Sequence, residues 1–309
     1  MRYITFGTQE KQTSELMLGL MRISATKPGE VGALIETGLD NGVNAIDIAD
    51  IYAGGKCEEI LGETFAANPG LRDRVFLQTK CGIRREGDFT WFDFSKEHIL
   101  EAVDASLKRM KVDHVDSLLL HRPDALMEPA EIGEAFDRLR AEGKVLDFGV
   151  SNMNPAMMDF LDKYLPFPIA ANHVQLSAAY TPAFDAGFHV NMQVDKAVMR
   201  DGGLFEYCRA NDIVIQAWSS LQYGFFEGVF LGSDKYPELN KTLARIAEEN
   251  GVTPTAAALA WILRYPGRTQ AVIGTTKASR VAEAAKACDF TLTKKQWYEI
   301  YLSAGNDLP

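Results

Sequence analysis

Four polar side chains follow three short apolar stretches of the chain. Asp47 and Tyr52 follow the first stretch, Lys80 ends the second and His121 follows the third. Because a tyrosine has an ordinary pKa of ~10, proton transfer by Tyr52 at neutral pH requires a nearby cation. Lys80 is a candidate for that cation, with Asp47 as its counter-ion, and a histidine can orient a carbonyl oxygen by donating a hydrogen bond. These residue types together indicate protonation of a carbonyl group.

Each of the four also has an ordinary structural explanation. A strand-end aspartate, an amphipathic tyrosine, a solvated lysine and a half-buried histidine are all common in folded proteins. The combination carries more information than any member, because the four recur at the ends of three predicted strands. Their joint function depends on a fold that brings those strand ends together.

The composition of the 309-residue chain indicates which classes of protein it can belong to. A hydrophobic content of 47% and a charged content of 24% are typical of a globular protein with a sizeable core. The net charge of −10 argues against a nucleic-acid or anionic-membrane partner. Four widely spaced cysteines predict neither a metal site nor a disulfide framework. Since no signal peptide or run of ~20 apolar residues occurs, we expect a cytoplasmic protein that does not bind membranes.

Apolar runs and helical periodicities alternate along the chain. We expect strands at 16–21, 43–48, 75–79, 116–120, 145–150, 170–176, 213–217 and 270–273. We expect helices at 28–41, 56–67, 96–110, 129–141, 238–250, 254–264 and 294–303, and one that opens at Asn154-Pro155. Ser95, Asn154 and Thr253 are predicted N-caps. Residues 2–8 predict a short strand or hairpin arm, and 177–200 a long loop that faces the substrate.

The alternation predicts one α/β domain over residues 1–309. Eight strands separated mostly by single helices favour parallel strands closed into a (β/α)8 TIM barrel, with active-site loops at the carboxyl ends and an extra C-terminal helix. An open doubly wound sheet is the alternative. Such a sheet usually carries a G-x-G-x-x-G run near its first strand, and this chain has none. The barrel is therefore preferred.

The polar residues at the predicted strand ends resemble a known family. Asp47 with Tyr52, Thr79-Lys80, the 120–124 segment Leu-His-Arg-Pro-Asp, and the segments at 143–145 and 149–152 resemble the aldo-keto reductases. The resemblance runs from about residue 18 to 283. The His-Arg-Pro-Asp form and the segment Asp201-Gly202-Gly203-Leu204 resemble the bacterial general-oxidoreductase branch of that family.

The resemblance implies a (β/α)8 barrel that binds NADP(H) and transfers hydride to an aldehyde or ketone. Tyr52 is then the general acid, Lys80 and Asp47 tune it, and His121 orients the carbonyl. The positions that match the family's cofactor site are Ser151, Asn152, His173, Trp218, Ser219, Leu221, Gly274, Thr275, Lys277 and Arg280. Ser151 and Asn152 match residues that hold the carboxamide, and Trp218 matches the aromatic that stacks on the nicotinamide. Arg280 matches the arginine that grips the 2′-phosphate.

Three positions depart from the family pattern. His173 stands where a glutamine normally helps to hold the carboxamide, and Ala284 replaces an asparagine that often contacts adenine. Gly274 stands where many members have a phosphate-binding lysine. These departures concern the strength of the NADPH preference more than the reaction.

Two other functions fit the same residues. Lys80 could act as a Schiff-base nucleophile in an aldolase-like lyase. Alternatively, the chain could be a nucleotide-binding regulatory subunit with slow turnover, as some proteins that resemble this family are. In the preferred interpretation the partner is a small-molecule carbonyl substrate. The sequence does not indicate whether the protein is a monomer or an oligomer. Loop residues that could face this substrate are Arg22, Asp50, Trp91, Phe92, Tyr180 and Phe184.

Overall fold

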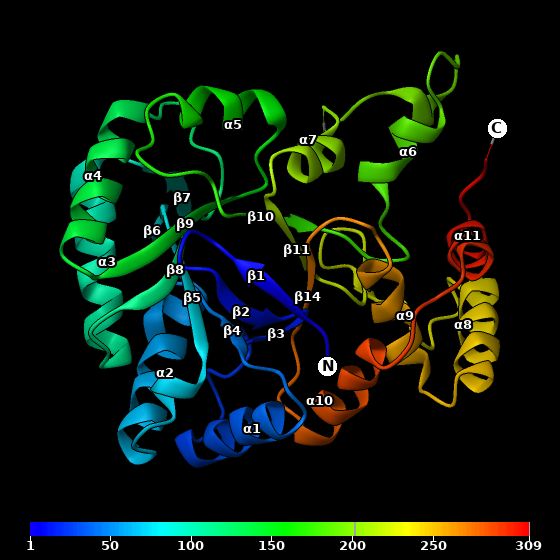
Figure 1. Ribbon diagram of the computed structural model, residues 1–309, viewed down its shortest axis with the longest axis horizontal. Helices are drawn as coiled ribbons and strands as arrows, with labels where there is room; N and C mark the ends of the chain where they lie inside the picture. The colour runs from blue at the N-terminus through cyan, green and yellow to red at the C-terminus, as the bar shows by residue number, and fades with distance from the viewer. Residues whose placement is uncertain (201, 309) are drawn as a thin grey trace.

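The core of the protein is a closed barrel of parallel strands, as predicted (Figure 1). The computed structural model describes residues 1–200 and 202–308, so Asp201 of the 201–204 segment lies outside the described residues. The barrel strands are β3 Leu16–Gly19, β4 Ala45–Asp47, β5 Phe76–Cys81, β8 Val115–Leu120, β9 Val145–Ser151, β10 Ala171–Gln175, β11 Val214–Trp218 and β14 Thr269–Ile273. Each falls within two residues of a predicted strand.

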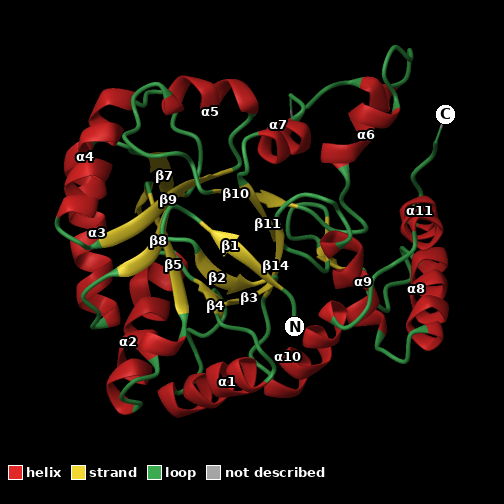
Figure 2. Cartoon of the chain, viewed as in Figure 1, coloured by secondary structure: helices red, strands yellow, loops and turns green. Residues whose placement is uncertain are grey.

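Helices surround the barrel on its outside (Figure 2). They are α1 Pro28–Asp40, α2 Lys56–Ala67, α3 Lys96–Met110, α4 Pro129–Ala141, α5 Pro155–Asp162, α6 Pro182–Phe188, α7 Leu204–Ala210, α8 Pro237–Glu249, α9 Pro254–Leu263, α10 Ala278–Ala285 and α11 Lys294–Ser303. The predicted caps are confirmed, since Ser95, Asn154 and Thr253 each accept a hydrogen bond from a backbone N–H in the first helical turn.

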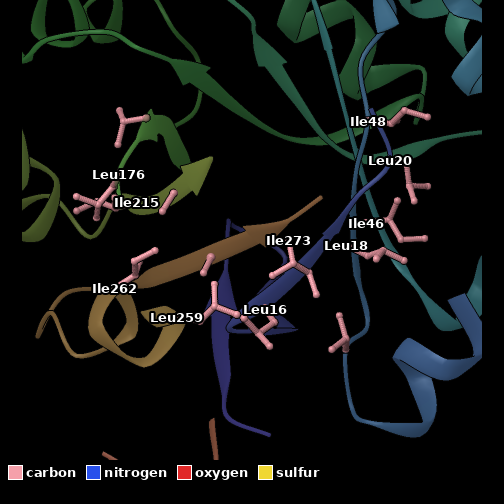
Figure 3. Close-up of a cluster of buried hydrophobic side chains, with 14 of the residues drawn as sticks. Leu16, Leu18, Leu20, Ile46, Ile48, Leu176, Ile215, Leu259, Ile262 and Ile273 are labelled. Carbon is pink, nitrogen blue, oxygen red and sulfur yellow. The ribbon is translucent and has the colours of Figure 1, made fainter. Parts of the chain in front are cut away.

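The alternation of side chains along each strand separates two apolar layers. Leu16 and Leu18 of β3 and Ile46 of β4 belong to the large cluster between strands and helices, part of which Figure 3 shows. Met17 and Ala45, their neighbours in sequence, belong to a smaller cluster inside the barrel. Because strand side chains alternate with a period of two, Asp47 shares the inner face with Ala45.

An N-terminal hairpin of β1 Tyr3–Phe6 and β2 Lys11–Ser14 covers one end of the barrel (Figure 1). Phe6 is fully buried, and its ring lies edge-to-face on Phe76 at the start of β5, with centroids 4.8 Å apart. The Asp147 carboxylate also accepts hydrogen bonds from the Thr8 backbone and hydroxyl. The hairpin arm predicted at residues 2–8 is confirmed, and it closes the amino end of the barrel.

Several short elements were not predicted. The interval 177–200, expected as a loop, contains α6 and a 3-10 turn at Asp195–Ala197. Two further hairpins, β6 Ile83–Glu86 with β7 Phe89–Phe92 and β12 Gln222–Tyr223 with β13 Gly228–Val229, lie in loops that follow β5 and β11. These elements, and the short helices α7 and α10, span too few residues to produce a clear apolar period.

The predicted C-terminal helix α11 packs beside α8 and α9. Trp297 on α11 and Trp261 on α9 stack with ring centroids 5.0 Å apart, and each indole N–H donates to the other's backbone carbonyl at 3.1 Å. Phe184 of α6 contacts both rings, so this residue packs α6 against the C-terminal helices. Among the described residues, no helix is long and apolar enough to cross a membrane.

The close contact between helices α2 and α3 can be tested by substitution of a glycine at their interface. A Cβ on Gly62 would lie 2.1 Å from the backbone oxygen of Arg109, so a Gly62→Ala variant must push the two helices apart. We expect a loss of ~1–3 kcal/mol in the free energy of unfolding, measured by urea denaturation. Gly29→Ala is the control, because nothing lies within 4 Å of its added Cβ. Equal stability of the two variants would contradict this packing.

Candidate active site

Asp47, Lys80 and Tyr52 meet at the carboxyl end of the barrel. Asp47 is the last residue of β4 and pairs in register with Gln78 of β5, so Lys80 lies two residues farther along the same inner face. Beyond β4 the chain stays alongside β5, because the Asp50 N–H donates to the Lys80 carbonyl at 3.1 Å. A 3-10 turn, Tyr52–Gly55, then directs the phenol back to Lys80.

The Lys80 side chain is fully buried and its ammonium has three acceptors. Its Nζ donates to the Asp47 carboxylate at 2.6 Å, to the Ile48 carbonyl at 2.8 Å and to the Tyr52 hydroxyl oxygen at 3.2 Å. An ammonium carries three protons, so these three bonds account for all of its donors. The side chain is therefore held as a cation in one position.

The charge on Lys80 follows from its neighbours. Burial acts to lower the pKa of Lys80, but attraction to Asp47 and to Tyr52 outweighs burial, and the pKa lies above its ordinary value. A Schiff-base nucleophile requires a neutral amine. The surroundings of Lys80 stabilise the charged ammonium and therefore oppose the formation of a neutral amine.

The Tyr52 hydroxyl remains protonated in this environment. Burial raises its pKa above the ordinary value, although the Lys80 ammonium acts in the opposite direction. The predicted cation does favour the phenolate, but removal of the phenol from water disfavours the phenolate more strongly. Since the hydroxyl oxygen accepts from Lys80, its own proton is available for donation.

His121 lies beside the phenol as a neutral imidazole. It directly follows β8, its backbone N–H donates to the Cys81 carbonyl at 2.9 Å, and its ring lies edge-to-face on Tyr52 with centroids 5.7 Å apart. Burial lowers its pKa well below the ordinary value, and Lys80 and His173 lower it further. Its buried Nδ1 has no hydrogen-bond partner among the described residues.

A second group consists of Ser151, the last residue of β9, Asn152, which follows it, and His173 in the middle of β10. The Ser151 hydroxyl donates to the His173 carbonyl at 2.9 Å, and the Asn152 amide donates to that hydroxyl at 2.7 Å. Asn152 adopts a left-handed backbone with φ 56°, a conformation that asparagine tolerates. His173 is buried, its pKa is lowered well below the ordinary value by burial and by Lys80, and its Nε2 has no partner among the described residues.

Trp218, the last residue of β11, has a neighbour that the sequence did not single out. The Arg122 guanidinium lies 5.3 Å from the Trp218 ring centre and 5.8 Å from that of Phe225. Phe226 stacks on Trp218 at 5.8 Å. Arg122 directly follows His121, so its position in a strand-end motif was the signal that could have identified it.

The loop after β11 is tied to the neighbouring strand β14. Ser219 has a left-handed backbone with φ 52°, and its hydroxyl donates to the Gln222 side chain at 2.8 Å. The Ser220 hydroxyl donates to the Val272 carbonyl at 2.8 Å, and the Leu221 carbonyl accepts from the Phe230 backbone N–H at 3.2 Å. These bonds hold the loop close to the segment that follows β14.

Gly274, Thr275, Lys277 and Arg280 occupy that segment and the first turns of α10. The Thr275 hydroxyl accepts from the Lys277 backbone N–H at 3.1 Å. The side chains of Lys277 and Arg280 are exposed, and neither forms an ion pair with another described residue. Two cations are therefore available at this corner of an acidic protein.

Two other loop candidates have different surroundings. Trp91 stacks on Phe89 within the β6–β7 hairpin, and the Arg84 guanidinium lies 5.4 Å from its ring centre. Burial, with repulsion from Glu58, raises the pKa of Asp50 to about 7. Its buried Oδ1 has no hydrogen-bond partner among the described residues. Asp50 lies beside Lys80, because its backbone N–H donates to the Lys80 carbonyl, but its carboxyl group forms no ion pair with a described residue.

A family model matches most of the chain. The model for the aldo/keto reductase family matches residues 15–301. The chain belongs to this family. The closed barrel of eight parallel strands is the fold of this family.

Individual relatives cover almost the whole of this aldo/keto reductase. The chain is 36% identical to the 6-dehydroglucose reductase of Agrobacterium fabrum strain C58 over 303 residues, 95% of each chain. It is 34% identical to the oxidoreductase YdhF of Escherichia coli strain K12, over 99% of each chain. An aldo-keto reductase from Klebsiella pneumoniae, solved in complex with NADPH, superposes with a TM-score of 0.72 at 25% identity and covers 97% of this chain and 93% of its own. The chain is thus an oxidoreductase of this family.

Removal of the buried ammonium tests the electrostatics of the site. In Lys80→Met, the Asp47 carboxylate loses its cation while it stays buried, and we expect a loss of ~3–5 kcal/mol in the free energy of unfolding. Adding Asp47→Asn to this variant should recover most of the loss. Lys56→Met is the control, because its pair with Glu59 is half exposed and contributes less than ~1 kcal/mol. Equal effects of the two lysine substitutions in urea denaturation would show that the Lys80 pair is not buried.

Proposed function

We propose that this protein catalyses the NADPH-dependent reduction of an aldehyde or ketone to an alcohol. The observation that carries the proposal is the Lys80 ammonium, which donates at once to Asp47 and to the Tyr52 hydroxyl. A phenol that accepts from a cation is a better proton donor than one in an apolar pocket alone. The family supports carbonyl reduction as the general chemistry.

Tyr52 is the proposed general acid. As a carbonyl carbon accepts hydride, negative charge develops on the oxygen, and the Tyr52 O–H donates its proton there. The Lys80 ammonium then stabilises the phenolate that remains, and Asp47 holds the ammonium in line. Neutral His121 has one N–H to donate, so it can orient the carbonyl oxygen beside the phenol.

The residues at the strand ends fit a nicotinamide cofactor. Bound NADPH supplies the hydride. Asn152 and Ser151 are fixed against β10 with polar groups suited to a carboxamide, and His173 adds a buried ring nitrogen that lacks a partner among the described residues. The Trp218 ring offers a flat surface for stacking.

Other proposed contacts lie farther along the cofactor. Ser219 and Leu221 lie in the loop after β11, which is tied to β14, and Gly274 and Thr275 lead into α10. Lys277 and Arg280 provide the available cations that a 2′-phosphate requires. The family match over 15–301 also supports one domain for the whole chain.

The two alternative functions are less well supported. A Schiff-base lyase needs a free amine, whereas all three donors of Lys80 are in use and its charge is stabilised by Asp47. A regulatory subunit with slow turnover does not require the complete set of Asp47, Tyr52, Lys80 and His121, which we call the acid group. In this chain the four residues are assembled. We therefore retain the reductase.

The proposed substrate is a small-molecule carbonyl. The name 6-dehydroglucose reductase of the Agrobacterium fabrum relative describes a sugar with a carbonyl at C6. A sugar aldehyde therefore belongs in the substrate panel, together with an activated aromatic aldehyde and a dicarbonyl.

Tyr52→Phe tests the acid. We expect the wild-type protein to oxidise NADPH when a carbonyl from the panel is added, and the variant to lose at least ~100-fold in kcat, because removal of a general acid typically costs about 10²–10⁴-fold. Absorbance at the NADPH band measures the rate. Tyr298→Phe on α11 is the control and should match the wild type. An undiminished rate in Tyr52→Phe would exclude the acid role.

Arg280→Ala tests the phosphate contact. Loss of a charged hydrogen bond corresponds to ~1.5–3 kcal/mol, so we expect the Kd for NADPH to rise about tenfold to a hundredfold and the Kd for NADH to stay constant. Titration calorimetry measures both. The control is Lys286→Ala, which removes one positive charge at the far end of α10, where Lys286 pairs with Asp289. Equal weakening of NADPH binding in both variants would indicate a general charge effect.

A further inference from the structure

Three buried glutamines fill the barrel between the Lys80 group and the N-terminal hairpin. Gln78 of β5, Gln216 of β11 and Gln270 of β14 are each completely inaccessible to solvent. Gln216 and Gln270 pair in register on neighbouring strands, whereas β5 lies on the opposite side of the barrel. A barrel interior is usually filled with apolar side chains, so three amides in contact require a separate explanation.

The amides form one continuous chain of hydrogen bonds. Gln78 Nε2 donates to Asp47 Oδ1 and to Gln216 Oε1, each at 2.9 Å. Gln216 Nε2 returns a bond to Gln78 Oε1 at 2.9 Å and donates to Gln270 Oε1 at 3.0 Å. Gln270 Nε2 donates to the Ser14 carbonyl of β2 at 2.9 Å. The chain therefore joins the closed amino end of the barrel to Asp47.

A single atom of Asp47 connects the amide chain to the acid group. Oδ1 accepts from Gln78 Nε2 at 2.9 Å and from Lys80 Nζ at 2.6 Å. An ionised carboxylate only accepts hydrogen bonds, so Gln78 must turn its NH₂ group toward Asp47. The reciprocal pair with Gln216 holds the Gln78 amide in that orientation.

We propose that Gln78 is a positioning residue for the acid group: it holds Asp47 Oδ1 in line with Lys80, and the ammonium is thereby held on Tyr52. The proposal rests on the proposed reductase function, in which this ammonium assists Tyr52. Gln78 does not touch the substrate in this mechanism, and it acts only through Asp47. Gln216 braces Gln78, and Gln270 extends the chain to the hairpin.

Two matched substitutions separate positioning from general stability. Gln78→Leu and Gln270→Leu each remove one buried amide from the same chain, but only the first removes a bond to Asp47. We expect both variants to lose stability in urea. Only Gln78→Leu should lose about tenfold in kcat, which corresponds to ~1.4 kcal/mol. Its Kd for NADPH should be unchanged, because no cofactor contact is altered.

The dependence of kcat on pH separates the two roles, because a purely structural role of Gln78 would leave that dependence unchanged. The titratable groups around the Lys80 ammonium are Asp47, Asp50, Tyr52, His121 and His173. Asp47 raises the pKa of Lys80, so a misplaced Asp47 lets the ammonium lose its proton at a lower pH. The high-pH fall in kcat should move down by about one pH unit in Gln78→Leu, and should not move in Gln270→Leu.

Gln78→Glu provides a second variant of nearly the same shape if Gln78→Leu does not fold. When the introduced carboxyl group is protonated, it can donate to Asp47 in place of the amide, whereas an ionised carboxylate at this position repels Asp47. We expect a kcat close to the wild-type value at acid pH that falls more steeply than in the wild type as the pH rises. A wild-type profile in this variant would overturn the proposal.

A crystal structure of Gln78→Leu gives a test that needs no turnover. We expect the Asp47 carboxylate to rotate away from Lys80 and the 2.6 Å contact to lengthen. An unmoved Asp47, an unchanged kcat in Gln78→Leu, or equal kinetic losses in Gln270→Leu would each overturn the positioning role. If the wild-type protein reduces no carbonyl, the proposed function fails by itself, and the position of Asp47 in the variant still decides the role of Gln78.

Discussion

The site depends on a lysine ammonium held entirely out of water. Such a charge is stable only if its protons are all bonded and a counter-charge lies beside it. Asp47, the Ile48 carbonyl and the Tyr52 hydroxyl meet both conditions at distances of 2.6–3.2 Å. The same contacts that stabilise the ammonium also aim it at the phenol. The bonds that stabilise the ammonium are therefore the same bonds that the proposed proton transfer uses.

The barrel makes this arrangement possible through its alternation of side chains. Inward positions of neighbouring strands form layers: apolar residues at the amino end, amides in the middle, and charged or titratable groups at the carboxyl end. The hairpin with Phe6 closes the amino end. The three layers are in contact, because the amides connect the hairpin to Asp47 by hydrogen bonds. An apolar middle layer would fill the same space and leave Asp47 with one fewer donor.

The histidines show how burial selects chemistry. His121 and His173 both have pKa values well below the ordinary one, because burial and the Lys80 charge disfavour an imidazolium. Neutral rings keep one donor and one acceptor each. The positive charge that contacts the phenol is then that of Lys80, with Arg122 farther out beside Trp218. In the proposed mechanism, Lys80 therefore supplies the positive charge and His121 orients the carbonyl oxygen.

The sequence by itself predicted the strands, most of the helices, the barrel, and a group of strand-end residues, Asp47, Tyr52, Lys80 and His121, that the structure brings together. It did so because apolar runs mark the strands, helical periodicities mark the helices between them, and polar residues follow the apolar runs at the strand ends. Only the tertiary structure revealed the contacts of Gln78 and Arg122. Their significance depends on contacts with Gln216 and Trp218, which lie far away in the sequence, and no local pattern encodes a contact across the barrel. The net pKa of Tyr52 was likewise decided by burial, a property that appears only when the chain has folded.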